Sequence, residues 1–245
     1  MQICIISLFP EIFSALNVGI PGRAQKKGLI QLSHLNPRDF TEDKHRTVDD
    51  RPFGGGPGMV MIMQPLYKTI QAAKQILGMN TTVSYLSAQG KKIDRACIQA
   101  FSQRKTAILL TGRYEGIDQR LLDSEVQEEW SIGDFILSGG EFAALCLIDA
   151  IIRLLPGALG NSMSTKKDSF INGLLDHPHY TRPRIINGLA VPDVLCKGDP
   201  KLIERWRLKQ ALGQTWKKRP DLLQNRILSE QEQVLLDEFI CEQTQ

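Results

Sequence analysis

The sequence predicts an α/β fold followed by a smaller, mainly helical domain. Three short apolar runs have the length and composition of buried strands, at 2–8, 82–86 and 106–110. Segments predicted to be helical lie between and after them, at 59–77 and 141–155. A stretch rich in Gly, Ser and Thr at 157–169 is typical of a linker. We therefore expect an α/β domain over 1–159, a flexible linker over 160–169 and a helical domain over 170–245.

Length and composition fit a globular protein with an ample core. The chain has 245 residues, of which 42% are hydrophobic and 23% charged, as is ordinary for one large domain or a domain with an appendage. The longest apolar run, 142–155, contains Asp149 and Arg153 and is too short to span a bilayer. Met1-Gln2-Ile3 lacks the basic start of a signal peptide. We therefore expect a cytoplasmic protein with no membrane partner.

The cysteines and histidines predict neither a disulfide framework nor a metal site. The five cysteines are dispersed, odd in number and without a CxxC pair. Cys4 and Cys146 lie in apolar runs, so we expect both in the core. His177 and His179 flank Pro178 and could suggest a metal pair, but no third ligand is expected nearby in sequence, so a structural role is favoured over metal binding.

The first predicted strand is not followed by a nucleotide-binding fingerprint. Residues 2–8 (QICIISL) suit a buried strand, and Phe9-Pro10-Glu11 then opens a helix with an early proline and an acid in its first turn. A Rossmann fold would place a glycine fingerprint here, and Ser7-Leu8-Phe9-Pro10 has none. This observation counts against a Rossmann-type domain.

Residues 38–58 form a polar, charged segment that ends in a run of glycines. The run is Gly54-Gly55-Gly56-Pro57-Gly58, which does not match GxGxxG. Gly90-Lys91 does not match a phosphate-binding Walker loop either. A flexible surface loop is one interpretation of 38–58. A functional loop is the other, because long structureless loops in compact domains tend to be functional.

Two predicted strands end in loops that could hold a ligand. The strand at 82–86 runs into Leu86-Ser87-Ala88-Gln89-Gly90, and the strand at 106–110 runs into Thr111-Gly112-Arg113-Tyr114-Glu115-Gly116. In open α/β sheets, ligands bind at the carboxyl ends of the strands. Arg113 and Glu115 could instead pair with each other at the surface, which is the default interpretation of a lone Arg-x-Glu.

The glycine-broken stretch, 128–141 (EEWSIGDFILSGGE), precedes a long apolar helix. Glycine at 133, 139 and 140 allows sharp turns or close approach of a ligand to the backbone. Unpaired backbone N–H and C=O groups could form hydrogen bonds with a flat, polar ligand such as an adenine ring. A strand, a tight turn and a helix start without any ligand explain the pattern equally well. The helix at 141–155 is apolar nearly all round, as in a buried or dimer-facing helix, and Arg153 suits its dipole.

The C-terminal region is predicted to be helical and to carry a basic stretch, Lys201–Arg226. Apolar pairs four residues apart mark helical faces, at Leu202/Trp206, Leu208/Leu212 and Leu212/Trp216. Ser229 and Glu232 form a capping box before an apolar run. The net charge is only +3, but the basic stretch has eight Lys or Arg against two acids. Such a field attracts phosphates, and a solvated helix face explains it equally well.

Five motifs together resemble the bacterial tRNA (guanine-N1)-methyltransferases, members of the knotted SPOUT class. They are SLFPEIF at 7–13, PRDFTEDKHRTVDDRPFGGGPGM at 37–59, TGRYEGID at 111–118, EEWSIGDFILSGGE at 128–141 and GLLDHPHYTRP at 173–183. They occur in the family's order, from about Ser7 to Trp216. The resemblance implies an α/β SPOUT domain whose trefoil knot forms the cofactor cleft, followed by a helical tRNA-binding domain. Topology rules argue against knots, so that expectation rests on the resemblance alone.

The resemblance also implies the methyl donor and the residues that hold it. The family uses S-adenosylmethionine. Its binding residues correspond here to Tyr85, Leu86, Gly112, Glu115, Ile132, Gly133, Asp134, Phe135, Ile136, Leu137, Gly139 and Gly140. The chain departs from the family at Ala88, where the usual residue is proline. The loop thereby loses a fixed φ angle but keeps its carbonyl groups.

The implied reaction is methylation of N1 of the tRNA guanosine just 3′ of the anticodon. Guanine N1 is not nucleophilic while protonated, so a general base is needed. Asp168, in the linker before Ser169-Phe170, matches the family's catalytic aspartate. Negative charge moves to O6 as the proton leaves, and Arg153 matches the residue that stabilises it.

The expected partners follow from the same resemblance. The family binds tRNA and acts as a homodimer, in which the linker and small domain of one protomer complete the other's site. It also responds to Mg²⁺, although this sequence has no carboxylate cluster that would locate an ion. One rival function is RNA binding without catalysis, which needs no acid such as Asp168 beside phosphates. Another rival function is methylation of a ribose hydroxyl, which the PHYTRP motif at 178–183 disfavours.

Overall fold

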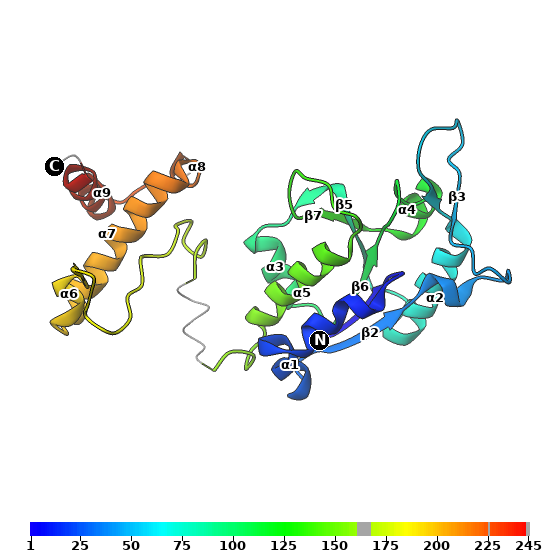
Figure 1. Ribbon diagram of the computed structural model, residues 1–245, viewed down its shortest axis with the longest axis horizontal. Coiled ribbons are helices and arrows are strands. Elements are labelled where there is room, and N and C mark those ends of the chain that lie inside the picture. Colours follow the sequence, from blue (N-terminus) through cyan, green and yellow to red (C-terminus); the bar gives the residue numbers. More distant parts are fainter. Residues whose placement is uncertain (161–167, 225, 244–245) are drawn as a thin grey trace. The chain divides into compact units, whose positions relative to one another are not determined.

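The chain falls into two compact units, Met1–Ser162 and Met163–Gln245 (Figure 1). The structure, a computed structural model, describes residues 1–160, 168–224 and 226–243. All of the predicted cofactor-binding residues and Arg153 belong to the first unit, whereas Asp168 belongs to the second.

The first unit is built on a five-stranded sheet in which every pair of neighbouring strands is parallel. Its order is β2-β1-β6-β5-β7. The strands are β1 (Gln2–Ile6), β2 (Gln31–Leu35), β5 (Val83–Lys92), β6 (Thr106–Thr111) and β7 (Glu128–Ser131). This arrangement confirms the predicted α/β class, because parallel strands need crossover connections.

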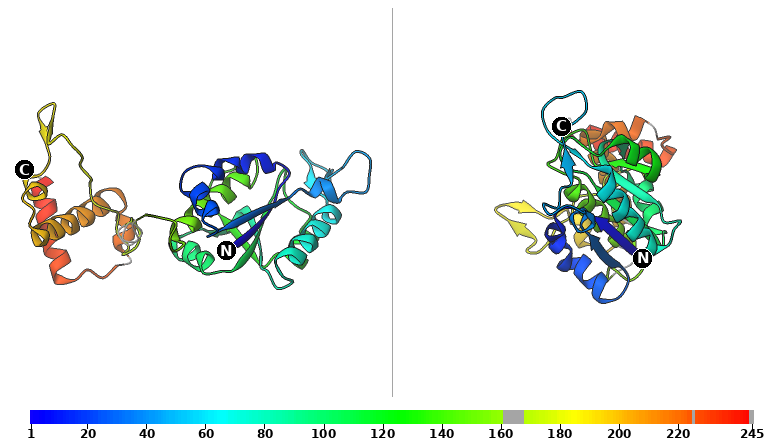
Figure 2. Two further views of the ribbon diagram at one scale, coloured as in Figure 1. Left: turned by 90° about the horizontal axis from the view of Figure 1, so that it is seen from below. Right: turned by 90° about the vertical axis from the view of Figure 1, so that its right-hand side faces the viewer.

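Side chains of the sheet alternate between two apolar cores. Ile3 and Ile5 pack into one core, and Cys4 and Ile6 into the other, because successive strand residues face opposite sides. The first core is closed by η1 (Pro10–Asn17), α1 (Gly19–Lys26), α3 (Arg95–Ser102) and α5 (Glu141–Leu154). The second is closed by α2 (Met63–Leu77) and α4 (Gln119–Glu125). Helices therefore cover both faces of the sheet (Figure 2).

A projecting loop lies between two very short strands, β3 (Asp49–Asp50) and β4 (Val60–Met61), which pair antiparallel. It follows the 3₁₀ helix η2 (Pro37–Phe40) and extends away from the body of the first unit (Figure 1). Phe53 in this loop is fully exposed. The loop predicted within 38–58 is therefore present, and its role stays a prediction.

Several expected boundaries differ from the structure, beginning with the strand expected over 2–8, which ends at Ile6. The helix expected to open at Phe9-Pro10-Glu11 is a 3₁₀ helix, and α1 begins only at Gly19, which has a left-handed backbone (φ +63°). The helix expected over 59–77 begins at Met63, because β4 pairs with β3. The strand expected over 82–86 extends to Lys92, because it resumes pairing with β7 after a register shift.

The expectation for the cysteines is right at one position and wrong at the other. Cys4 is fully buried in the sheet. Cys146 is exposed, because it lies on the side of α5 opposite the buried Ala144, Leu147 and Ile148. All five cysteines are free.

The second unit is small and largely helical. Its elements are the hairpin β8 (Ile185–Ile186) and β9 (Leu189–Ala190), then α6 (Asp193–Cys196), α7 (Pro200–Lys218), α8 (Pro220–Gln224) and α9 (Glu230–Gln243). Its core packs α7 against α9 through Leu212, Leu235 and Leu236. The predicted capping box is confirmed, since the Ser229 N–H donates to Glu232 Oε2 (2.9 Å) and the Glu232 N–H donates to Ser229 Oγ (3.2 Å).

Across the described residues, none of the helices combines the length and the apolar composition that crossing a membrane would require.

Candidate functional site

A pocket of about 530 Å³ lies in the first unit, beyond strands β5, β6 and β7. Its walls come from three segments, 85–89, 112–117 and 129–140, together with Gln119, Leu122 and Ala143. Segment 112–117 follows the end of β6, 129–140 contains the end of β7, and 85–89 lies where the pairing of β5 with β7 shifts register. The pocket therefore lies at the edge where open α/β sheets bind ligands, as the strand order predicts.

The pocket gathers eleven of the twelve residues that the sequence singles out for cofactor binding. They are Tyr85, Leu86, Gly112, Glu115, Ile132, Gly133, Phe135, Ile136, Leu137, Gly139 and Gly140. Asp134 is the exception: its side chain is 86% exposed and its Oδ2 lies 2.9 Å from Lys92 Nζ. Within the glycine-broken stretch, this carboxylate therefore faces solvent.

Glycine allows the walls of the pocket to touch through their backbones. The Gly140 N–H donates to the carbonyl of Gly112 (2.9 Å), which ties the glycine-broken stretch to the loop after β6. A Cβ on Gly140 would lie 3.1 Å from both Leu86 O and Thr111 Cα, which is tighter than ordinary contact. On Gly139, a Cβ would collide with the Arg113 side chain. A larger residue at either position would therefore push the walls apart.

Large apolar side chains at the mouth of the pocket are partly or mostly exposed to solvent. Phe135 is 54% exposed and Ile136 is 84% exposed. Leu137, next to them, is 38% exposed. Large apolar side chains exposed together beside a cavity are typical of a ligand-binding surface. They suit a flat ligand with an apolar face.

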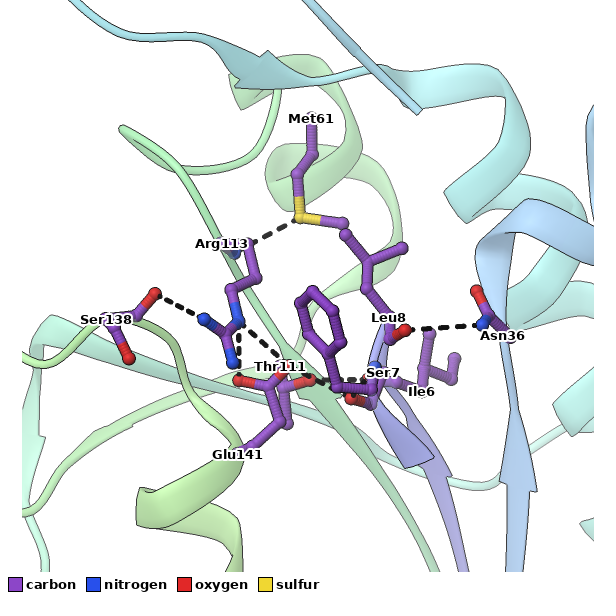
Figure 3. A network of polar contacts seen from close by, with 10 residues as sticks. Ile6, Ser7, Leu8, Asn36, Met61, Thr111, Arg113, Ser138 and Glu141 are labelled. Carbon is purple, nitrogen blue, oxygen red and sulfur yellow. Dashed lines mark hydrogen bonds and ion pairs between the residues drawn. The ribbon is translucent and has the colours of Figure 1, made fainter. Parts of the chain in front are cut away.

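A buried carboxylate is at the centre of a network of polar contacts next to the pocket residues Arg113 and Gly140 (Figure 3). Glu141, the first residue of α5, has no exposed surface. Its Oε1 accepts hydrogen bonds from Ser7 Oγ (3.0 Å) and Arg113 Nε (3.2 Å). Arg113 Nε also lies 3.0 Å from Oε2, and Arg113 Nη1 donates to the Ser138 carbonyl (3.1 Å). Three segments far apart in sequence therefore meet at one charge.

Arg113 is held from several sides. Its guanidinium lies 4.6 Å from the centre of the Phe9 ring, and its backbone N–H is 3.2 Å from Met61 Sδ. The pair with Glu115 that a lone Arg-x-Glu suggests does not form, because the cation is committed to Glu141. Glu115 instead lines the pocket. The sequence offered one hint of this partner: an acid at the start of an otherwise apolar helix.

Tyr85 on β5 enters the pocket as a neutral phenol. Burial, followed by the nearby charge of Glu129, raises the pKa of Tyr85 to about 12. The hydroxyl therefore stays protonated at physiological pH and can donate a hydrogen bond, but it is a poor choice for a general base. Glu129 and Trp130, which also line the pocket, were not singled out from the sequence although they lie in the glycine-broken stretch.

The two predicted catalytic residues lie outside the lining of the pocket and in different units. Arg153 is partly buried in the last turn of α5. Asp168 is partly buried at the start of the described part of the second unit. The residue after it is anchored, because the Asp176 N–H donates to Ser169 Oγ (2.9 Å). The first unit by itself therefore holds the pocket and Arg153 but no copy of Asp168.

The basic stretch is less positive than its sequence suggests. Five of its cations are in ion pairs: Arg205–Glu238, Arg207–Glu204, Lys209–Glu242, Arg219–Asp221 and Arg226–Glu232. Three of the acids, Glu232, Glu238 and Glu242, come from α9, which packs on α7. Among the described residues, no acid forms an ion pair with Lys201, Lys217 or Lys218. The field available to phosphates is therefore concentrated at the two ends of α7.

Comparison with known proteins gives concordant matches over nearly the whole chain. The family model described as tRNA (Guanine-1)-methyltransferase TrmD matches residues 1–225. A tRNA (guanine-N(1)-)-methyltransferase of Aeromonas hydrophila is 56% identical over 243 residues, covering 99% of this chain and 98% of the relative. Those of Nitrosococcus oceani and Idiomarina loihiensis are 56% and 55% identical, covering 99% and 100% of this chain and 96% and 97% of the relatives.

Replacing Arg113 by Met tests how far the pocket depends on its buried charge. Glu141 would stay buried without its cation, and breaking a buried pair in this way typically costs about 3–5 kcal/mol. Urea unfolding of Arg113→Met should show a loss of that order. Arg113→Met/Glu141→Gln should recover much of it, because the amide carries no charge.

Arg120→Met is the matched control, because the Arg120 side chain is 72% exposed in its pair with Asp118. It should leave the unfolding free energy unchanged. Equal losses in the single and double Arg113 variants would show that packing, and not the buried charge, determines the stability.

Proposed function

Because the chain belongs to the tRNA (guanine-1)-methyltransferase family and is thus a methyltransferase, we propose that it transfers a methyl group from S-adenosylmethionine to N1 of the guanosine immediately 3′ of the anticodon. The pocket beyond β5, β6 and β7 is the observation that supports S-adenosylmethionine as the methyl donor. Backbone groups approach closely there, and apolar side chains surround the mouth. Such a lining suits a nucleoside that is flat, apolar on its faces and polar at its edges.

The charges around the pocket also suit this donor. S-adenosylmethionine carries a positive sulfonium, an ammonium group and a carboxylate, so it is a net cation. Glu115 and Glu129 line the pocket, and the cation of Arg113 is neutralised by Glu141. A cationic ligand therefore meets carboxylates without an opposing free cation from Arg113. The Tyr85 hydroxyl and the bare backbone offer hydrogen bonds to the edges of an adenine.

In the proposed mechanism, the enzyme aligns two reactants and removes one proton. The sulfonium already makes the methyl group electrophilic, so alignment supplies much of the rate, up to about 7–11 kcal/mol in ideal cases. Asp168 takes the proton from guanine N1, whose electron pair then attacks the methyl carbon as the bond to sulfur breaks. Arg153 stabilises the charge that moves onto O6. S-adenosylhomocysteine leaves as the second product.

The proposed architecture includes the trefoil knot and a homodimer, as in the family. The contact of the glycine-broken stretch with the loop after β6 is compatible with a knotted cleft. A dimer is favoured by the face of α5 that the first unit leaves uncovered, which includes Phe142 (47% exposed) and Cys146. A site shared between protomers would bring Arg153 of one chain to Asp168 of its partner.

The second unit is the proposed tRNA-binding domain. Lys201, Lys217 and Lys218 supply positive charge at the two ends of α7, because the pairs with α9 neutralise Arg205 and Lys209 between them. Contacts of this kind position the RNA backbone and carry no sequence information. Selection of the guanosine is therefore assigned to the catalytic site.

One experiment tests the proposed reaction directly. The protein is incubated with methyl-labelled S-adenosylmethionine and unmodified tRNA transcripts, and the labelled nucleoside is identified by mass spectrometry after digestion. The expected product is N1-methylguanosine next to the anticodon. Label on a ribose would support the rival 2′-hydroxyl methylase, and tRNA binding without any transfer would support a non-catalytic RNA-binding protein.

Gly140→Val should weaken binding of S-adenosylhomocysteine to the free protein, because the side chain would press on Leu86 and Thr111 and open the pocket. Calorimetry measures the change. Gly160→Val is the matched control, since a Cβ there meets nothing within 4 Å. Unchanged affinity in a folded Gly140→Val protein would remove Gly140 from the site.

Asp168→Asn should lower the single-turnover rate of methylation by about two to four orders of magnitude, because the amide cannot accept the N1 proton. The affinity for S-adenosylhomocysteine should barely change, since Asp168 lies outside the pocket lining. Asp237→Asn, on α9 of the same unit, should keep the wild-type rate. A rate within a few-fold of wild type for Asp168→Asn would mean that the proton leaves by another route.

Lys217→Ala/Lys218→Ala should weaken tRNA binding and flatten its dependence on salt. Each lost phosphate contact should reduce the slope of log affinity against log salt by roughly 0.7–0.9. The single-turnover rate at saturating tRNA should survive. Lys26→Ala/Lys105→Ala removes the same charge from exposed positions of the first unit and is the control. If both double variants behave alike, the ends of α7 do not track the RNA backbone.

A further inference from the structure

A group of metal-ligating side chains lies outside the pocket, in the second unit. It consists of Asp176, His177 and His179, whose ligand atoms all lie within 4.8 Å of one another. Within the part of the chain that the structure describes, it is the sole group of three or more His, Cys, Asp or Glu with this geometry. The two histidines looked structural from the sequence because no third ligand was evident. Asp176 supplies that ligand.

The distances within the group are those of a compact coordination sphere. His179 Nε2 lies 2.9 Å from Asp176 Oδ2, and His177 Nε2 lies 3.7 Å from Asp176 Oδ1. Ligands about 2.0–2.1 Å from a tetrahedral zinc ion stand about 3.3 Å apart. The observed separations bracket that value. No two of the ligand atoms are more than 4.8 Å apart, so side-chain movements alone could bring them around one ion.

The orientation of His177 points to a ligand role. Its Nδ1 lies 3.0 Å from the Pro178 carbonyl, which can only accept, so Nδ1 carries the proton and Nε2 keeps its lone pair. Metal-bound histidines are held by the same kind of outer hydrogen bond. The ring is also fixed by packing, since its side chain is only 13% exposed and lies edge-on to Trp206.

A simple ion pair accounts for only part of this arrangement. Asp176 and His179 are close enough to hydrogen-bond, and they would form a pair without any third residue. His177 Nε2 stands 3.7 Å from Asp176 Oδ1, which is too far for a hydrogen bond, so the pair leaves this nitrogen unexplained. An unprotonated nitrogen this close to a carboxylate becomes favourable when a cation lies between them.

We propose that Asp176, His177 and His179 form a binding site for a divalent transition-metal ion, with zinc the best match. Two imidazoles and one carboxylate are the ligands that zinc takes when three protein groups leave the fourth position open. The His179 side chain is 70% exposed, so the open position faces solvent. Mg²⁺ fits poorly, because it prefers oxygen ligands in an octahedron. This group therefore gives no support to the magnesium expected by resemblance.

The backbone around the ligands is already arranged. The His177 N–H donates to Asp176 Oδ1 (2.7 Å), and the Asp176 N–H donates to Ser169 Oγ (2.9 Å). A bound ion would therefore stiffen the segment from Ser169 to His179. Binding itself does not depend on the proposed role of the neighbouring Asp168.

The test uses the full chain and measures metal binding without any assay of methylation. Protein stripped with a chelator is titrated with Zn²⁺ in a calorimeter, and with Co²⁺ while the visible spectrum is recorded. The expected result is one ion per chain and visible Co²⁺ bands without the near-ultraviolet absorption of a thiolate ligand. That absorption would instead locate the ion at cysteines and overturn the proposal.

Two variants and a control assign the ion to this group. His179→Asn and Asp176→Asn should each weaken Zn²⁺ binding at least about tenfold, since loss of a ligand exceeds the loss seen for outer-shell partners. His45→Asn, at an exposed histidine of the first unit, should bind as wild type does. His179→Asn removes an exposed side chain, and circular dichroism checks that it folds. Wild-type affinity in both ligand variants, or no binding at micromolar Zn²⁺ in the wild type, would overturn the proposal.

Discussion

The pocket of the first unit depends on one buried charge. Glu141 is inaccessible to solvent, and a carboxylate in that position is tolerable because Arg113 pairs with it and Ser7 donates to its Oε1, whereas Oε2 accepts no hydrogen bond from the described residues. The same interactions fix the segment after β1, the loop after β6 and the start of α5 relative to one another. Two walls of the pocket, the loop after β6 and the glycine-broken stretch, are attached to this network. The shape of the cavity is thus held by electrostatics as much as by apolar packing.

The sequence predicted well those features that are local or repetitive. Apolar runs located three of the five sheet strands, and the capping box located the start of α9. The sequence pattern did not predict β2 (Gln31–Leu35), because this strand at the edge of the sheet mixes polar and apolar residues. Nor did it predict that Met61 would leave the following helix to pair with β3, because such pairing is a tertiary choice.

In the candidate site too, local features were predicted from the sequence and long-range contacts were not. Family resemblance indicated eleven residues of the pocket lining, and glycine spacing by itself marked only the glycines among them, because close backbone approach favours glycine. The sequence carried almost no indication of the ion-pair partner of Arg113. That partner, Glu141, lies 28 positions away, whereas the expected partner, Glu115, lies two positions away. The positive charge of the basic stretch was overestimated for a related reason. Glu238 and Glu242 neutralise cations of α7 that precede them by 33 positions. Local counts of charge cannot register such distant compensation.

The tie between Ser7 and Glu141 also has a consequence for the order of folding. The two residues are 134 positions apart, and the Thr111 hydroxyl bonds the Ile6 carbonyl across 105 positions. Contacts that close such long loops form only after much chain entropy has been lost, and topologies rich in them fold slowly. During synthesis, β1 emerges long before the residue that anchors it. A nascent chain that stops short of Glu141 can hold most of its strands, but it has no finished pocket.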